Sequence, residues 1–201
     1  GLSRYNENKN EWKYYRDFFK RKGVISNALT LHQDQNERIW FGCNFEGLWY
    51  FEPNQETPIR WQLPDIEPNE RHYITKIIED KEQNLWISSH SGLYKINFKN
   101  KTSQKIPLGK YETQKIALNS VFISANQHIW VSGFDFIYEL DNKGKLIQEI
   151  DRSKGLKGQP YYIVEDEFNF LWIGTNNGLQ TFSPGTKKFR DFWLEEGVLE
   201  N

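Results

Sequence analysis

Two clusters of carboxylates are the first candidates for chemistry in this sequence. Glu79 and Asp80 are adjacent, and Glu165, Asp166 and Glu167 form a run of three acids. Paired carboxylates can act as general acid and general base in one reaction. Both clusters, however, end an apolar segment and precede a Trp by the same distance, so they occupy one recurring turn. We therefore expect a structural role for them, and we predict no catalytic residue.

Other patterns that would carry catalysis or bind a metal are missing. The sequence has no Gly-x-Ser-x-Gly motif and no Gly-rich phosphate-binding loop. Cys43 has no local His partner, and we expect it to pack as a small apolar residue just past a strand. The four histidines are far apart and do not have metal-ligand spacing. They are His32, His72, His90 and His128. We predict no metal and no cofactor.

Composition excludes several classes of partner. Lys and Arg number 26 against 27 Asp and Glu, so charge favours neither nucleic acid nor an anionic membrane. The single cysteine cannot form an intrachain disulfide. No apolar run approaches the ~20 residues that cross a bilayer. The chain opens with Gly and contains no Met, which is typical of a segment of a longer polypeptide.

A repeat built around Trp organises the whole chain. Trp40, Trp86, Trp130 and Trp172 are separated by 46, 44 and 42 residues, and apolar residues flank each of them. A strand with apolar residues on both faces is buried on both sides. An acid precedes the Trp by six residues in three copies, at Asp34, Asp80 and Asp166, and Ser124 stands there in the third copy. Gly-Leu follows the Trp in the same three copies, at Gly47, Gly92 and Gly178.

Each repeat predicts four short strands: an apolar first strand, the Trp strand, a strand after Gly-Leu, and a more polar fourth strand at a solvent-facing edge. Four-stranded units at a period of about 40–45 residues predict an all-β fold, a β-propeller of four-stranded antiparallel blades. An all-β sandwich with coincidental hairpins is the alternative. The predicted units are the outer strands of a preceding blade at 1–22, repeats at 23–68, 69–112, 113–156 and 157–196, and the lead into a next blade at 197–201. Residues 1–201 thus form a single propeller segment of about four and a half blades, which we expect to be open or partial.

The pattern Asp-x-x-x-x-[Leu/Ile]-Trp-[Ile/Val/Phe]-[Gly/Ser]-x-x-x-x-Gly-Leu resembles the two-component regulator propeller repeat. Glu165–Phe182 and Glu79–Tyr94 are the copies nearest to it, and Gly23–Asn27 resembles the family's lead into a first strand. The family usually has Gly three residues before the Trp. This sequence has Glu37, Gln83, Gln127 and Asn169 there, and its third repeat lacks both the Asp and the Gly-Leu.

The resemblance implies a sensor. In that family the repeats form seven-bladed propellers in the periplasmic part of hybrid histidine kinases, chiefly of Bacteroidetes, many of which respond to oligosaccharides. An Ig-like domain, a membrane helix, a kinase, a receiver and often an AraC-type DNA-binding domain follow. The resemblance thus implies a periplasmic, non-catalytic segment of an inner-membrane protein. It would contact membrane only through the parent protein and would bind no nucleic acid itself.

The loops around the central channel are the expected ligand face. Their residues include aromatic rings and planar polar side chains, which are typical of sugar sites. The second-to-third strand turns and the links between blades supply Asn44, Glu46, Arg71, His72, Tyr73, His90, Asp135, Tyr161, Tyr162, Asn176 and Asn177. We predict an oligosaccharide or another small extracytoplasmic ligand as partner, together with the rest of the propeller, downstream sensor domains and a homodimer partner. The alternatives are an interaction propeller without a small ligand and, third, a propeller lyase or glycosidase.

Overall fold

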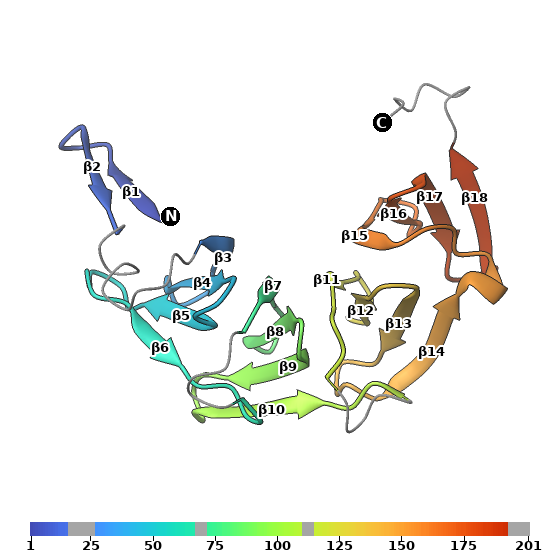
Figure 1. The fold of residues 1–201 in the computed structure, drawn as a ribbon, viewed down its shortest axis with the longest axis horizontal. Coiled ribbons are helices and arrows are strands. Elements are labelled where there is room, and N and C mark those ends of the chain that lie inside the picture. Colours follow the sequence, from blue (N-terminus) through green and yellow to red (C-terminus); the bar gives the residue numbers. More distant parts are fainter. Residues whose placement is uncertain (16–26, 67–71, 110–114, 193–201) are drawn as a thin grey trace.

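The computed structural model describes residues 1–15, 27–66, 72–109 and 115–192, and in these ranges β-strands joined by turns and short links are the main regular structure. Four four-stranded antiparallel sheets and one two-stranded hairpin follow one another around an arc (Figure 1). We call the sheets blade 1 to blade 4 in chain order. The arc is open, as the sequence predicts for a partial β-propeller: the hairpin lies at one end, and blade 4 lies at the other (Figure 1).

The strands follow the predicted order in every blade. The hairpin consists of β1 (Ser3–Asn6) and β2 (Glu11–Tyr14). Blade 1 consists of β3 (Ala28–Gln33), β4 (Ile39–Cys43), β5 (Leu48–Phe51) and β6 (Ile59–Trp61). Blade 2 consists of β7 (Ile74–Glu79), β8 (Asn84–Ser89), β9 (Gly92–Asn97) and β10 (Thr102–Ile106). Blade 3 consists of β11 (Ser120–Ile123), β12 (Ile129–Ser132), β13 (Phe136–Leu140) and β14 (Leu146–Asp151). A short 3-10 helix, η2 (Arg152–Lys154), leads to blade 4, which consists of β15 (Pro160–Glu165), β16 (Leu171–Thr175), β17 (Gly178–Ser183) and β18 (Lys188–Phe192).

Polarity places the strands within each blade. The first strands β3, β7, β11 and β15 line the inside of the arc, and the fourth strands form its outer rim (Figure 1). The Trp strand β8 is buried along its whole length, whereas β10 alternates between exposed and covered residues. This gradient agrees with the rising polarity of the sequence toward the fourth strand.

A turn that the Asp side chain organises precedes each Trp strand. In blade 2 the carboxylate of Asp80 accepts hydrogen bonds from the backbone N–H groups of Glu82 (3.0 Å) and Asn84 (2.8 Å). Its second oxygen accepts the indole N–H of Trp86 at 2.9 Å. Asp34 and Asp166 accept the indole N–H groups of Trp40 and Trp172 in the same way, at 2.9 and 2.7 Å. The spacing of six residues in the sequence is therefore the spacing that brings the acid to the Trp.

The residue three positions before each Trp has a left-handed backbone. The φ angles are 64° at Glu37, 62° at Gln83, 66° at Gln127 and 62° at Asn169. Glycine adopts this region without steric cost, which explains why the resembled family usually has Gly there. This chain forms the same left-handed turn in all four blades with residues other than glycine.

The third blade keeps the same turn with different residues. Ser124 replaces the Asp and donates its hydroxyl to Asn126 Oδ1 at 2.6 Å. That Asn126 oxygen then accepts the backbone N–H of His128 at 3.2 Å. The short amide of Asn126 thus performs part of the role that the carboxylate performs in the other blades.

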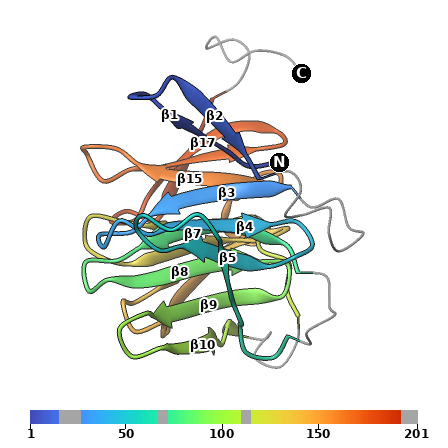
Figure 2. The same ribbon diagram turned by 90° about the vertical axis from the view of Figure 1, so that its left-hand side faces the viewer.

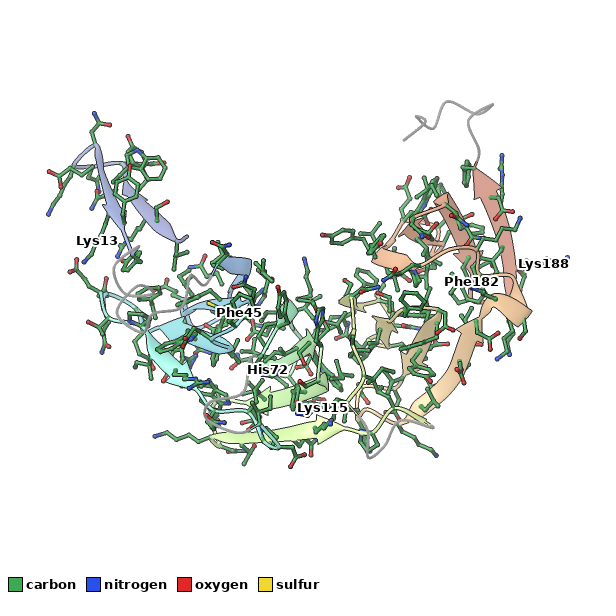
Figure 3. The ribbon with its side chains drawn as sticks, viewed as in Figure 1. Lys13, Phe45, His72, Lys115, Phe182 and Lys188 are labelled. Carbon is green, nitrogen blue, oxygen red and sulfur yellow. The ribbon has the colours of Figure 1, made fainter. Side chains whose placement is uncertain are left out.

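Apolar clusters lie between successive blades, and Trp40, Trp86 and Trp130 each pack against the blade that follows. Trp40 packs in one cluster with Ile77, Leu85 and Ile87 of blade 2. Trp86 packs with residues of blade 3, and Trp130 with residues of blade 4, which include Phe182. Figure 3 shows Phe182 among the side chains of the fourth sheet. The blades are thus joined by nearest-neighbour interfaces, as in other repeat proteins.

Cys43 departs from its expected position. It is the last residue of β4 instead of lying just past the strand, and it is fully buried. The backbone pairs Ala28 with Cys43 across a register shift in β3, and this bulge extends the ladder by one residue.

Candidate functional site

The carboxylate clusters that could suggest acid/base chemistry are engaged in structure. Glu79 lies at the end of β7, and its Oε2 accepts the backbone N–H of Gln35 in blade 1 at 2.9 Å. Glu165 accepts the backbone N–H of Ala125 in blade 3 in the same manner, at 2.6 Å. These acids therefore cap the turn of the preceding blade, while their Asp neighbours hold the turn of their own blade. Burial raises the pKa of the Glu79 carboxyl above its ordinary value of 4.5.

The candidate ligand face consists of the second-to-third strand turns and the links between blades. Most of the predicted residues in its first half join blade 1 to its neighbours. Asn44 Oδ1 accepts the backbone N–H of Asn27 at 2.8 Å, just before β3 begins. Glu46 forms an isolated parallel β-bridge with His72. His72 is buried, and its ring lies edge-on to Tyr94 with centroids 5.8 Å apart. Figure 3 shows Phe45 and His72 close together where blade 1 meets blade 2.

Tyr73 and His90 form a stacked pair on this face. Their ring centroids are 4.6 Å apart and their planes differ by 6°, and the His90 N–H bonds the Tyr73 carbonyl at 3.0 Å. Phe45 meets Tyr73 edge-on at 5.4 Å. Burial lowers the pKa of the His90 imidazole below its ordinary value of 6.5. The stack covers one face of each ring. The exposed parts of the pair are the edge of the Tyr73 ring and the His90 imidazole.

Asn119 connects the face between blades 3 and 4. Its side-chain amide donates to the carbonyl oxygens of Gly133 at 2.9 Å and of Pro160 at 2.8 Å. It therefore joins the turn that carries Phe134 and Asp135, both exposed, to the start of the strand that carries Tyr161. Asn119 was not among the predicted residues, and its signal in the sequence is a polar side chain directly before a first strand.

The remaining predicted residues are divided between this face and a different surface. Asn176 Oδ1 accepts the backbone N–H of Gln159 at 2.6 Å, and Asn177 beside it is exposed. Tyr161 is 41% exposed at a register shift in β15. Tyr162, 68% exposed, pairs with Gly174 and lies on the side of blade 4 that corresponds to the covered sides of blades 1–3. Arg71 lies outside the described residues.

The geometry therefore leaves a smaller exposed set on the candidate face. Its members are His90, Phe134, Asp135, Tyr161, Asn176 and Asn177. Rings, an imidazole, a carboxylate and a carboxamide can stack on and hydrogen-bond to a polar ligand. Within the described ranges, no three His, Cys, Asp or Glu side chains form a group that could hold a metal ion. No helix in the same part of the chain is long and apolar enough to cross a membrane.

Comparisons with known proteins define the fold class. The chain matches the extracellular domain of the hybrid two-component system BT4673 from B. thetaiotaomicron with a TM-score of 0.71 at 22% identity, over 87% of this chain and 26% of that one. It matches the corresponding domain of BT3049 from the same organism with a TM-score of 0.72 at 20% identity, over 85% of this chain and 23% of that one. A virginiamycin B lyase from Staphylococcus aureus matches with a TM-score of 0.67 at 14% identity, over 83% and 55% of the two chains. The chain thus shares its β-propeller fold with extracellular domains of hybrid two-component systems and with a lyase.

The sequence is also similar to part of one curated protein. It is 26% identical over 196 residues to histidine kinase P4 of Formosa agariphila. The match covers 92% of this chain and 14% of that protein, so the chain spans a small part of its relative. No protein-family profile matches the sequence.

Proposed function

We propose that this chain is a non-catalytic sensory segment of a hybrid two-component system. It binds a glycan-derived ligand outside the inner membrane and signals to a histidine kinase and a transcriptional output carried elsewhere in the parent protein. The sensor domains that share its fold and the histidine kinase that shares its sequence support this proposal. The periplasm is the compartment that this role requires.

One observation carries the proposal: the residues that maintain the blades and the residues that form the exposed candidate face are different residues. The acids of the repeat bind backbone amides and indoles, while Phe134, Asp135 and Tyr161 remain exposed on one face. Asn119 holds the Phe134 turn and the Tyr161 strand at a defined separation. A rigid support with exposed rings and planar polar groups suits sugar binding better than proton transfer.

Signalling then follows from differential affinity. A ligand that contacts residues of two blades favours the arrangement of blades in which both contacts form. It shifts the equilibrium of the sensor by the difference between its affinities for the two arrangements. The link through Asn119 is the place in the described residues where such a ligand would bridge blade 3 and blade 4.

Titration calorimetry of the complete propeller against a panel of oligosaccharides tests the proposal. We expect at least one sugar to bind, and we expect Tyr161→Ala to weaken its binding by about 3- to 10-fold, since an aromatic contact contributes roughly 0.5–1.5 kcal/mol. Ile147→Ala is the matched control, because Ile147 is similarly exposed but lies on the fourth strand β14.

Other outcomes favour the rival functions. A panel without any binding, together with capture of a defined protein partner, would favour an interaction propeller. Turnover of any glycan would contradict the non-catalytic assignment and favour a lyase or glycosidase.

A further inference from the structure

The outer part of the space between two neighbouring blades differs along the arc. Between blades 1 and 2 it is aromatic: the ring of Phe98, in the turn after β9, packs against Trp40, Tyr50 and Trp61 with ring centroids 5.4–5.8 Å apart. In the equivalent turn of blade 3, Asp141 takes the place of Phe98. Between blades 2 and 3 the corresponding space is a polar groove of about 380 Å³. Both neighbouring blades are present here, so the groove belongs to a complete interface.

Blade 2 forms one wall of this groove, and blade 3 forms the other. Asn97 and Thr102 are cross-strand neighbours in one row of blade 2, and Lys95 and Gln104 are cross-strand neighbours in the next row. Figure 2 shows β8, β9 and β10, the strands of this wall, side by side. Lys143, in the turn after β13, lines the groove from blade 3. The lining side chains include two cations and no acid.

Lys95 is a largely buried cation with spare hydrogen-bond donors. Its side chain is 14% exposed, and its ammonium donates to the carbonyl oxygen of Asn142 in blade 3 at 2.9 Å. The carboxylate of Asp80 is 3.8 Å away, beyond hydrogen-bond distance, and it already accepts the indole N–H of Trp86. An ammonium has three N–H donors, and within the described ranges Asn142 accepts one of them. The groove is therefore a place where further acceptors can reach this cation.

Three other groups around the groove are also available to a ligand. The side chains of Thr102, Gln104 and Lys143 are exposed, and they form no hydrogen bond or ion pair with the described residues. A hydroxyl and a carboxamide can each donate and accept a hydrogen bond, while an ammonium donates to an anion. A cation that is largely withdrawn from water also attracts an anion more strongly than a cation in bulk solvent.

We propose that this groove binds a small hydroxylated molecule that carries an oxyanion, namely a carboxylate, sulfate or phosphate group. The oxyanion lies between the ammonium groups of Lys95 and Lys143. Hydroxyl groups of the ligand form hydrogen bonds with Thr102 and Gln104. The volume of about 380 Å³ is within the range of small-molecule sites.

The groove is separate from the candidate ligand face. Asn84, which lines the groove, begins β8, whereas the turn that carries His90 follows the end of the same strand. The two sites therefore lie at opposite ends of β8. The inference stands whether or not a sugar binds to the candidate face. An occupant of the groove contacts blade 2 and blade 3 at once.

A matched set of sugars tests the proposal. Glucuronate, glucose 6-sulfate and glucose 6-phosphate carry the three oxyanions on one kind of ring, and glucose carries none. Each is titrated into the chain at constant ionic strength while backbone amide resonances are followed by NMR. We expect at least one anionic member to shift resonances of residues 95–104 and 142–143 saturably. It should bind more than about tenfold more tightly than glucose, because hydrogen bonds between charged groups are the stronger ones.

Two exposed positions give variants that test the contacts. Gln104→Glu should weaken binding of the anionic sugar by more than about tenfold, because it places a carboxylate beside Lys95. Lys143→Ala should weaken it by about 2- to 5-fold, as expected for an exposed charge pair. Lys145→Ala is the matched control, since Lys145 is exposed in the same turn but does not line the groove. Unchanged urea midpoints would show that the variants fold as the native chain does.

Several results would overturn the proposal. One is the absence of any saturable shift in the groove, including the case in which shifts are confined to the turns of the candidate face. Another is equal affinity for glucose and the anionic sugars. Equal weakening by Lys143→Ala and Lys145→Ala would indicate non-specific attraction to surface charge. Acetate binding as tightly as glucuronate would contradict the hydroxyl contacts assigned to Thr102 and Gln104.

Discussion

The side of blade 2 that faces blade 3 and the corresponding side of blade 4 carry the same motif in two environments. Trp86 is 0% exposed and packs in a cluster with residues of blade 3, whereas Trp172 is only half-buried. Both indoles donate to the Asp six residues earlier. The local turn is therefore identical, and the presence of a following blade accounts for the difference in burial.

The glycine two residues after the Trp shows the same contrast between blade 1 and blade 4. A Cβ on Gly42 in blade 1 would lie 2.3 Å from Ile74 of blade 2, while a Cβ on Gly174 in blade 4 would meet nothing within 4 Å. The motif thus prepares each blade for a neighbour, and the neighbour supplies much of the stabilisation. This is the behaviour expected of a chain whose stability is a sum of repeats and their interfaces.

The largest effect is expected from removing the Trp ring, which tests whether the ring is more deeply buried in blade 2 than in blade 4. Trp86→Ala should lower the free energy of unfolding by about 3–5 kcal/mol, because it removes a fully buried aromatic side chain. Trp172→Ala should cost under about 2 kcal/mol, since less apolar area is lost. Urea unfolding followed by circular dichroism measures both, and equal losses would show that blade 4 is covered in solution.

Adding one methyl group is the next test. Gly42→Ala should destabilise the chain by about 1–3 kcal/mol, because Ile74 must move to admit the new Cβ. Gly174→Ala should be nearly neutral in this chain. The thermal midpoints of the two variants give the comparison, and a neutral Gly42→Ala would indicate a looser interface between blades 1 and 2.

The left-handed turn residues sharpen the comparison further. Gln83→Gly should stabilise the chain by up to about 1 kcal/mol, because it relieves a Cβ clash at a φ of 62°. Asn169→Gly should gain less, since Asn tolerates this region better than Gln. Urea midpoints measure the difference, and a loss of stability at Gln83 would contradict the role assigned to its backbone.

Two carboxylates should give opposite, smaller pH effects. The Trp172 hydrogen bond lowers the pKa of Asp166 below 3.8, so its stabilisation is present above that value and is lost as pH falls through the folded-state pKa. Burial raises the pKa of Glu79 above 4.5, so its protonation in acid favours the folded state. Between pH 6 and pH 3, Asp166→Asn should flatten the loss of stability and Glu79→Gln should steepen it. Denaturant unfolding at each pH measures the free energy of unfolding. If this free energy changed with pH in both variants as it does in the native chain, both assignments would be contradicted.

The fold was predictable because the repeat encodes it locally. Asp–Trp pairs, Gly-Leu steps and apolar first strands define blades 1, 2 and 4, and blade 3 has the same turn because Asn126 preserves it. The indole hydrogen bond itself was not predicted, although the spacing of six residues carries it.

The candidate site was less predictable, because a side chain in a turn has no periodic signal. His72 and Asn44 have types that suit a ligand, yet the chain uses them to join strands. Tyr162 was placed among the loop residues, but its neighbour Tyr161 forms the bulge and turns Tyr162 onto the open side of blade 4. Phe45 and Asn119 were not predicted, because neither residue recurs at the equivalent position of another blade.

The open arc is tested most directly by hydrogen exchange at the indole N–H groups of Trp40, Trp86 and Trp172. All three donate to an Asp carboxylate, so the local bond is matched and the covering blade is the difference. The structure predicts that Trp172 exchanges faster than the other two by more than about tenfold. Equal protection of the three indoles would contradict an open blade 4.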